Sequence, residues 1–382
     1  MTWIKKTFYI SLLVFVIALL FWGVYNLSFK KASPQQETAR VPAGNQQPIA
    51  PKNNTDDPIA AVSDEGVIAP TLVPAGNAIK YYSASTGKVF QIDTNGNNKK
   101  AIAEKELIGI IDAFWSPDKT KVITKFKAAD GNFRFYFYDY AADRATPLKD
   151  NIDQIAWNGS SNKIFYKYFD AKTKKRTLSI SEPDGTGWSD LADIDFRDMF
   201  ISQVPRSGLV SFWNKPDSYT ATNLDVIALA GGDVKTILKD LYGADYLWNN
   251  EGTDALVSYV TAKGGNKLQL ATVNSSGGEF INLNIPTFAS KCVWSKNDKV
   301  VYYALPGSIP ENGVMPNDYN SGKFQTTDTF WKIDLTTGEK TRIVSLDKME
   351  GAYDATEMFL NNDESILFFV NKTDGKLYRV LL

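Results

Sequence analysis

Short apolar runs separated by small polar turns recur along most of the chain. In one pattern an aromatic residue is followed by a polar turn, and an apolar strand begins seven residues after the aromatic. Copies start at Trp115, Trp157, Trp248, Trp294 and Phe359, and a weaker copy without the aromatic starts at Gln203. Apolar runs bounded by turn residues in this way are typical of β-strands joined by tight hairpins.

A second pattern lies between the copies of the first and consists of a strand, a turn containing Gly or Asp, and a short apolar strand. Examples are residues 89–102, 178–191 and 330–343. The two patterns together form a unit of about 45 residues, the length of a four-stranded propeller blade. Such a sheet buries its faces only against neighbouring sheets.

The sequence therefore predicts an all-β fold, a seven-bladed β-propeller of four-stranded antiparallel blades over residues 78–382. The repeated tryptophans are expected to pack between the blades. The first blade lacks a clear first strand and the last blade lacks a clear fourth strand. We expect residues 66–73 to supply a missing strand and close the ring.

The repeat unit resembles the TolB-like, WD40-like propeller repeats of bacterial envelope proteins. The resemblance rests on Phe114-Trp115-Ser116-Pro117-Asp118, followed by a lysine-rich turn and an apolar strand, and on turns such as residues 182–187. It covers roughly residues 78–382. The resemblance implies a platform that binds other proteins. In some enzymes such propellers gate a separate hydrolase domain, for which this chain has no room.

The N-terminal part of the chain has a different composition. Thr7–Leu27 is uncharged and has aromatic residues at both ends, which predicts a transmembrane helix within residues 1–29. No convincing cleavage site follows, so we expect a retained anchor. Residues 30–77 are rich in Pro, Gln and Asn and predict a flexible linker. The expected location is the bacterial cytoplasmic membrane, single-pass, with the N-terminus inside and the propeller on the extracytoplasmic side.

Composition excludes several kinds of chemistry. The chain has no histidine and a single cysteine, Cys292, so it contains no intrachain disulfide, no Ser–His–Asp triad and no His-ligated zinc. A formal net charge of −1 gives no field that would attract nucleic acid. Phosphate-binding and nucleophile-elbow motifs are absent, and the acidic loop 93–104 departs from the EF-hand pattern. The sequence predicts no cofactor and no metal.

The spacing from Trp294 to Phe359 is longer than the others, and the excess falls in residues 305–330, here called the insertion. Long loops on compact domains are more often functional or disordered than idle. The insertion carries five sizeable apolar side chains that would explain contact either with a partner or with the chain's own propeller. These candidate partner-binding residues are Ile309, Val314, Met315, Tyr319 and Phe324. Trp213 and Tyr219, in another loop, form a secondary candidate.

Three functional hypotheses follow. The first is a membrane-tethered, non-catalytic platform that binds a protein or a cell-envelope polymer and is not an enzyme. The alternative is a propeller enzyme that acts on a sugar, lactone or peptide with carboxylates or a metal in the central channel. The third is a structural spacer in an envelope assembly. Carboxylates that converge at the channel mouth would favour the enzyme.

Overall fold

A computed structural model describes residues 57–159 and 162–382. The described residues all belong to one compact unit, Pro51–Leu382. The predicted transmembrane helix Thr7–Leu27 lies outside the described residues. Over the two described ranges, no helix is both long enough and apolar enough to cross a membrane.

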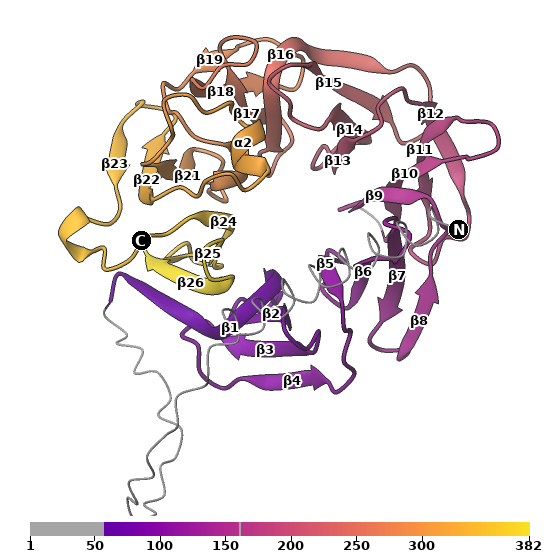
Figure 1. Cartoon of the computed structure of the whole chain (residues 1–382), viewed down its shortest axis with the longest axis horizontal. Helices are drawn as coiled ribbons and strands as arrows, with labels where there is room; N and C mark the ends of the chain where they lie inside the picture. Colours follow the sequence, from indigo (N-terminus) through magenta and orange to yellow (C-terminus); the bar gives the residue numbers. More distant parts are fainter. Residues whose placement is uncertain (1–56, 160–161) are drawn as a thin grey trace, which may run out of the picture. The chain divides into compact units, whose positions relative to one another are not determined.

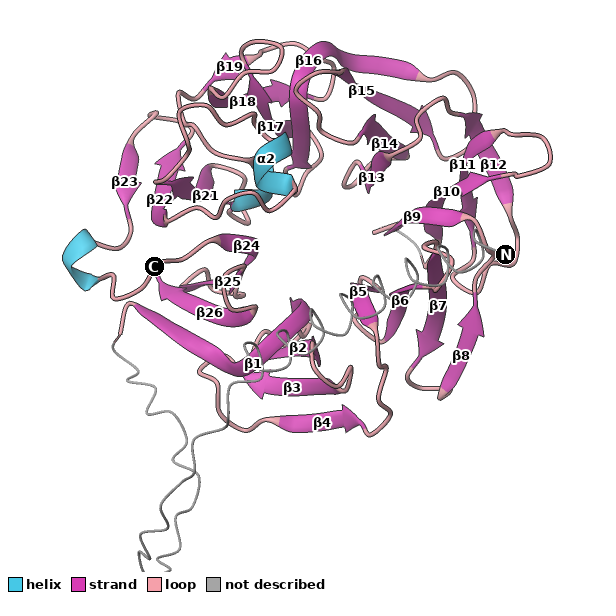
Figure 2. Cartoon of the chain, viewed as in Figure 1, coloured by secondary structure: helices cyan, strands magenta, loops and turns pink. Residues whose placement is uncertain are grey.

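Antiparallel strands form nearly all the regular structure of this unit (Figure 2). The strands build sheets that stand around a common centre, as the repeat predicted for a β-propeller (Figure 1). Helical turns in the described ranges are short. They are η1 (Ala289–Lys291), α2 (Asn317–Asn320) and η2 (Leu346–Lys348).

Three sheets have four strands each, and in each the first strand in sequence lies nearest the centre (Figure 1). One consists of β5 (Ile110–Trp115), β6 (Lys121–Lys127), β7 (Phe133–Asp139) and β8 (Arg144–Pro147). The next consists of β9 (Ile152–Trp157), β10 (Ile164–Phe169), β11 (Arg176–Ser181) and β12 (Ser189–Asp193). The third consists of β20 (Cys292–Trp294), β21 (Val300–Pro306), β22 (Asp328–Asp334) and β23 (Lys340–Arg342).

Two larger sheets each contain a long strand that belongs to two neighbouring groups of four. One sheet holds β13 (Met199–Gln203), β14 (Leu209–Asn214), β15 (Ala221–Ala228), β16 (Lys235–Trp248), β17 (Asp254–Val260), β18 (Leu268–Asn274) and β19 (Ile281–Asn282). The other holds β24 (Ala355–Leu360), β25 (Ile366–Asn371), β26 (Lys376–Leu381), β1 (Ile59–Leu72), β2 (Ala78–Ser83), β3 (Val89–Asp93) and β4 (Lys100–Ala103). β16 and β1 are the shared strands.

β1 joins the two ends of the folded chain. Its first half pairs with the C-terminal strand β26, from Ile59 opposite Val380, and its second half pairs with β2, from Val67 opposite Ser83. The sequence analysis expected residues 66–73 to close the ring, and β1 does so, but it begins earlier, at Ile59. The folded part therefore starts inside the segment 30–77 that was predicted as linker. Besides backbone pairing, Ile59, Val62 and Val67 of β1 contribute apolar side chains to the core.

The repeated tryptophans pack between neighbouring groups of strands, as predicted. The indole N–H groups of Trp115, Trp157 and Trp294 donate to backbone carbonyls of the preceding inner strand at 2.8, 2.7 and 3.1 Å. Trp248 donates instead to the Ser211 hydroxyl at 2.9 Å. Each tryptophan thus fills apolar space and also bonds to the neighbouring group of strands.

The last copy of the first pattern is displaced by one residue. Trp115 pairs with Val122, seven residues on, and in β24 the equivalent pair is Leu360 with Leu367. The sequence comparison had put Phe359 in the tryptophan position because Phe359 is aromatic. Strand pairing therefore assigns that position to Leu360.

Candidate functional site

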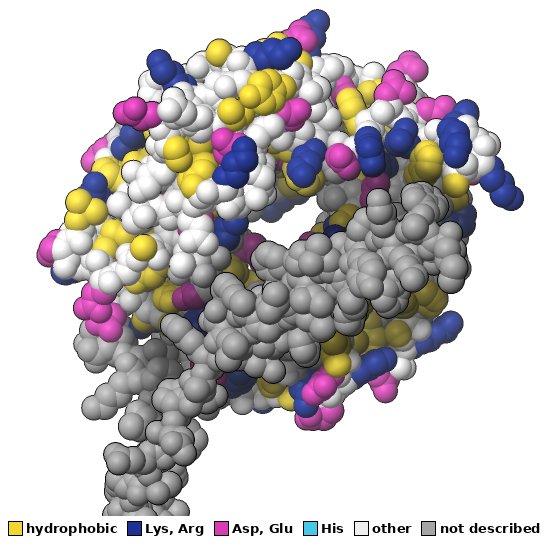
Figure 3. Space-filling view, in the orientation of Figure 1, with side chains coloured by type: hydrophobic (Ala, Val, Ile, Leu, Met, Phe, Trp, Pro, Cys, Tyr) yellow, Lys and Arg dark blue, Asp and Glu magenta, His cyan; other side chains and the backbone are white. Residues whose placement is uncertain are grey.

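The inner strands of the ring begin on one shared face. The groups contain an even number of antiparallel strands, so β5, β9 and β24 run in the same direction and start at the same end of the central opening. We call this end the upper face. Figure 3 shows the opening in the surface, with charged side chains of both signs at its edge.

One position in the inner strands repeatedly carries a polar side chain. It lies three residues before the residue that ends the strand, which is tryptophan in four cases and Leu360 in the fifth. The polar residues at this position are Asp112, Gln154, Asp245, Lys291 and Glu357. The sequence analysis missed them, although counting back from each repeated aromatic would have found four of the five.

β-Bulges turn two carboxyl groups of the inner strands out of the regular ladder. The pairing register skips Asp153 in β9 and Glu357 in β24, and in β5 it skips Ile111, the residue before Asp112. Glu357 has a φ of +49°, a left-handed conformation that non-glycine residues rarely adopt. Bulges re-aim side chains and are common beside active sites.

Glu357 carries the most unusual carboxyl group at the opening. Its side chain is exposed, although other atoms of the ring lie close enough around the carboxyl group to desolvate it in part. Desolvation raises the pKa of Glu357 from 4.5 to about 7, and the negative charge of Asp112 adds to the shift. Burial also raises the pKa of Asp112, against the Ala113 N–H that donates to it at 2.8 Å and the charge of Lys125. Near neutral pH, therefore, Glu357 exists in both protonation states.

The charged groups continue along the upper face from β5 to β13. The ammonium of Lys167, which is 1% exposed, lies 2.6 Å from Asp153 and also contacts the Arg197 carbonyl. Burial raises the pKa of Asp153, and Lys167 opposes that shift. Asp198, just before β13, adds further negative charge near Asp153.

Asp245 has the same strand position but a closed environment. Its carboxylate accepts hydrogen bonds from the Trp213 indole at 3.0 Å and from the Tyr246 N–H at 3.1 Å. Burial raises the pKa of Asp245 to about 6, against the hydrogen bond from Trp213. Trp213 is itself buried, so this secondary candidate from the sequence packs inside the ring, whereas Tyr219 is 53% exposed.

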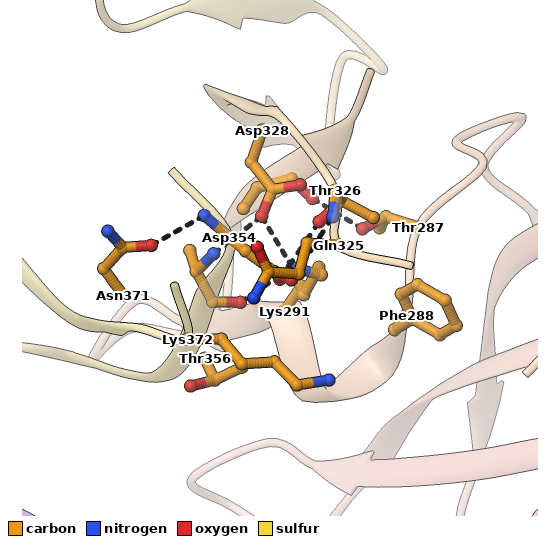
Figure 4. A network of polar contacts seen from close by, with 12 residues as sticks. Thr287, Phe288, Lys291, Gln325, Thr326, Asp328, Asp354, Thr356, Asn371 and Lys372 are labelled. Atoms are coloured by element: carbon orange, nitrogen blue, oxygen red, sulfur yellow. Dashed lines mark hydrogen bonds and ion pairs between the residues drawn. The ribbon is translucent and has the colours of Figure 1, made fainter. Parts of the chain in front are cut away.

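A second charged cluster ties the insertion to the ring (Figure 4). The Lys291 ammonium lies 2.6 Å from Asp328 Oδ2 and 2.7 Å from Asp354 Oδ1, and all three side chains are fully buried. Lys291 also donates to the Ala355 carbonyl at 2.9 Å. From the insertion, the Tyr319 hydroxyl donates to Asp354 at 2.6 Å. We call Lys291, Asp328 and Asp354 the buried triad.

The two carboxylates of the buried triad are not equivalent. Burial raises the pKa of Asp354, but the hydrogen bonds from Lys291 and Tyr319 outweigh it, and the pKa lies below its ordinary value. Thr326 adds two hydrogen bonds to Asp354, from its backbone N–H at 3.2 Å and its hydroxyl at 3.0 Å. Asp328 has one oxygen without a partner among the described residues, and burial raises its pKa.

The five predicted partner-binding residues lie together, on the chain's own ring. Met315 and Tyr319 are buried, and Ile309 and Phe324 pack against them and against Phe288. Val314 is half-buried. The insertion had three possible explanations: contact with a partner, packing on the chain's own propeller, or disorder. The contacts of these side chains show packing on the chain's own propeller. Whether the outer surface of the insertion also contacts a partner stays a prediction.

A polar cavity of about 730 Å³ opens beside these groups on the upper face. Its walls are drawn from residues 196–198 before β13, residues 214–221 around the β14–β15 loop, and residues 317–323 of the insertion. Arg197 and Asp198 belong both to this cavity and to the surroundings of Asp153. The cavity is therefore a neighbour of Asp153.

No protein-family model matches the chain, and no curated protein matches its sequence. Several solved structures are similar in fold. Oligogalacturonate lyase in complex with manganese superposes with a TM-score of 0.61 at 12% identity, covering 85% of this chain and 93% of that chain. Oligogalacturonate lyase from Vibrio parahaemolyticus gives 0.59 at 8% identity with the same coverage.

The β-propeller domain of the Trilobed protease from Pyrococcus furiosus also matches, with a TM-score of 0.53 at 12% identity, covering 82% of this chain and 92% of that chain. Identities this low establish the fold and leave the chemistry to the site. The chain is thus similar to β-propellers of enzymes over nearly the whole described ring.

The similarity to the lyases corrects the prediction of a non-catalytic platform. We had argued against an enzyme partly because the chain has no room for a separate hydrolase domain. The lyase is matched over 93% of its length, so its ring leaves little room for another domain and is nevertheless an enzyme. The prediction of a non-catalytic platform was therefore wrong as the preferred hypothesis, and the alternative of a propeller enzyme agrees better with the comparison.

Proposed function

We propose that the ring is an enzyme that cleaves a saccharide chain by acid–base chemistry at the upper face of its central opening. The observation that carries this proposal is the Glu357 carboxyl, whose pKa of about 7 makes it a proton donor near neutral pH. The charge of Asp112 acts on Glu357, so a second carboxyl is near it. Two carboxyl groups in unequal environments are the usual basis for assigning an acid and a base.

The roles follow from the two environments. Protonated Glu357 gives its proton to the glycosidic oxygen as the bond to the leaving sugar breaks. Asp112 as the carboxylate takes a proton either from the attacking water, in hydrolysis, or from a substrate carbon, in elimination. Both routes balance with the same pair, and a carbon–carbon double bond in the product would identify elimination. The polar cavity beside the opening would hold the rest of the saccharide chain.

The similarity to a lyase in complex with manganese does not imply a manganese site in this chain. Across the described ranges, no group of three or more His, Cys, Asp or Glu is placed to hold a metal ion. The sequence also offers no histidine. The residues present do not fit a comparable metal site, and the proposed steps use protein groups alone.

The experiment is a cleavage assay on a panel of neutral and acidic oligosaccharides with the full chain. Glu357→Gln and Asp112→Asn should each lower turnover by about 100-fold or more, since general acid–base groups contribute that much. Glu104→Gln is the matched control, because Glu104 follows directly after β4 and its side chain is 85% exposed. Unchanged turnover in both channel variants would overturn the proposal.

We further propose that Thr7–Leu27 anchors this ring to the outer side of the bacterial cytoplasmic membrane, where an envelope polysaccharide would be its substrate. The uncharged segment supports the anchor. We also propose that the shared strands β1 and β16 divide the five sheets into seven blades. Release of the chain from membranes by salt, without detergent, would contradict the anchor.

A further inference from the structure

A second cavity, of about 520 Å³, is lined by β2–β4, by β6–β8 and by the connection that follows β4. We call it the aromatic cavity. Its volume lies within the range of about 300–1,000 Å³ that is typical of small-molecule sites. Five aromatic side chains form its walls: Tyr82, Phe126, Tyr136, Tyr138 and Tyr140.

The walls of the aromatic cavity hold one another in place. Tyr82 and Tyr140 both stack on Trp115, with ring centroids 5.5 and 6.0 Å apart. Tyr138 meets Tyr140 edge-on at 4.7 Å. Rings fixed by such contacts cannot turn to fill the space, so the cavity exists before any ligand enters.

The polar groups around the cavity are largely paired already. The hydroxyls of Tyr82 and Tyr140 bond to each other at 2.6 Å, and the Tyr138 hydroxyl donates to Asp143. Arg134 is held by Asp130 at 2.9 Å and by Asp150 at 3.1 Å. Few hydrogen-bonding groups remain to face a ligand, and the walls present mainly carbon.

The rim of the cavity exposes apolar surface. Ile108 is 79% exposed and Tyr136 is 38% exposed, and both line the cavity. Their charged neighbours Lys105 and Glu106 have opposite signs and give the entrance no preferred ligand charge. Water in contact with this surface is released when an apolar molecule covers it, which favours binding.

We propose that the aromatic cavity is a binding site for an uncharged small molecule with an aromatic or similarly flat apolar ring. The volume, the fixed aromatic walls and the paired polar groups select this class over a sugar or an ion. This site shares none of the groups assigned to acid–base chemistry, so it stands or falls independently of the proposed enzyme.

The test uses the full chain and two dyes, uncharged N-phenylnaphthylamine and its anionic relative anilinonaphthalene sulfonate. The uncharged dye should bind more tightly, and its fluorescence should rise on binding. Ala103→Trp fills the cavity from β4 and should weaken binding of the uncharged dye by at least about tenfold. Ala101→Trp is the matched control, because Ala101 is exposed on the same strand and does not line the cavity.

Ala145→Trp, which fills the cavity from β8, provides a second variant at an exposed position that tolerates a large side chain. Circular dichroism checks that each variant is folded. All variants are measured at the same detergent concentration, so that dye taken up by the detergent contributes equally to each measurement. Equal binding by the wild type and both filled variants would overturn the proposal. Tighter binding of the anionic dye would overturn the assigned ligand class.

Discussion

Asp354 and Glu357 are three residues apart at the start of one inner strand, yet their carboxyl groups behave in opposite ways. Asp354 is fully buried and accepts hydrogen bonds from Lys291, Tyr319 and Thr326. Glu357 reaches the central opening, and no hydrogen bond from its carboxyl is recorded within the described residues. The pKa of Asp354 falls below its ordinary value, while that of Glu357 rises to about 7.

The difference shows that partners, and not burial alone, decide the charge of an acid in this ring. Loss of water favours the protonated form of both carboxyl groups, although Asp354 is fully buried and the Glu357 side chain stays exposed. Asp354 recovers that loss through a charged donor, Lys291, and neutral donors from the insertion, Tyr319 and Thr326. Glu357 has no such hydrogen bonds, and the negative charge of Asp112 raises its pKa further. The first acid is therefore suited to holding the structure together and the second to exchanging a proton.

The largest effect on stability is expected at Asp354, the carboxylate that has hydrogen-bond partners. Lys291→Met should destabilise the protein by about 3–5 kcal/mol, because it leaves Asp328 and Asp354 buried without their cation. Chemical denaturation of the full chain measures the loss. Lys299→Met, at an exposed position, is the control and should be nearly neutral. A small loss for Lys291→Met would show that water reaches the buried triad.

A smaller effect is expected from one donor to Asp354. Tyr319→Phe removes the hydroxyl that lies 2.6 Å from Asp354 and should cost about 1.5–3 kcal/mol, as for hydrogen bonds to charged groups. The loss should shrink at acidic pH, where Asp354 becomes protonated and needs the donor less. A cost that does not change with pH would mean that the tyrosine acts through ring packing alone.

The smallest effect on stability is expected at Glu357. Here the substitution should stabilise the protein relative to the wild type as pH rises, instead of destabilising it. The folded-state pKa of about 7 exceeds the ordinary 4.5, so the folded state binds the proton more tightly than the unfolded state. The wild type should therefore lose a little stability relative to Glu357→Gln as pH rises from about 4.5 through 7. Melting temperatures across this range measure the difference. Divergence in the opposite direction would place a cation beside Glu357.

The repeat made the overall fold predictable from sequence, since a blade is built from local hairpins with a regular period. The exceptions have physical causes. β1 begins earlier than the expected strand 66–73, because the Pro-, Gln- and Asn-rich composition of residues 30–77 as a whole masked the apolar positions Ile59 and Val62. In the last copy of the repeat, the tryptophan position was assigned to Phe359 because Phe359 is aromatic. Strand pairing assigns it to the next residue, Leu360.

The two clusters differ in how far sequence could reveal them. Asp112 and Glu357 share a fixed offset from the ends of their strands, so the repeat itself contains that signal. In the buried triad only Lys291 has this offset, and nothing in the repeat indicates that it pairs with Asp354, which lies 63 residues further along the chain. The apolar residues of the insertion indicated that it packs against something, and the contacts with Phe288 show that this surface belongs to the ring.

The account depends most on the titration of Glu357. Carbon-detected nuclear magnetic resonance of the side-chain carboxyl carbons measures it in the full chain, with Glu357→Gln used to assign the signal. The account predicts a midpoint near pH 7, and a lower one in Asp112→Asn, because that variant removes the neighbouring negative charge. A midpoint near the ordinary 4.5, unaffected by Asp112→Asn, would contradict it.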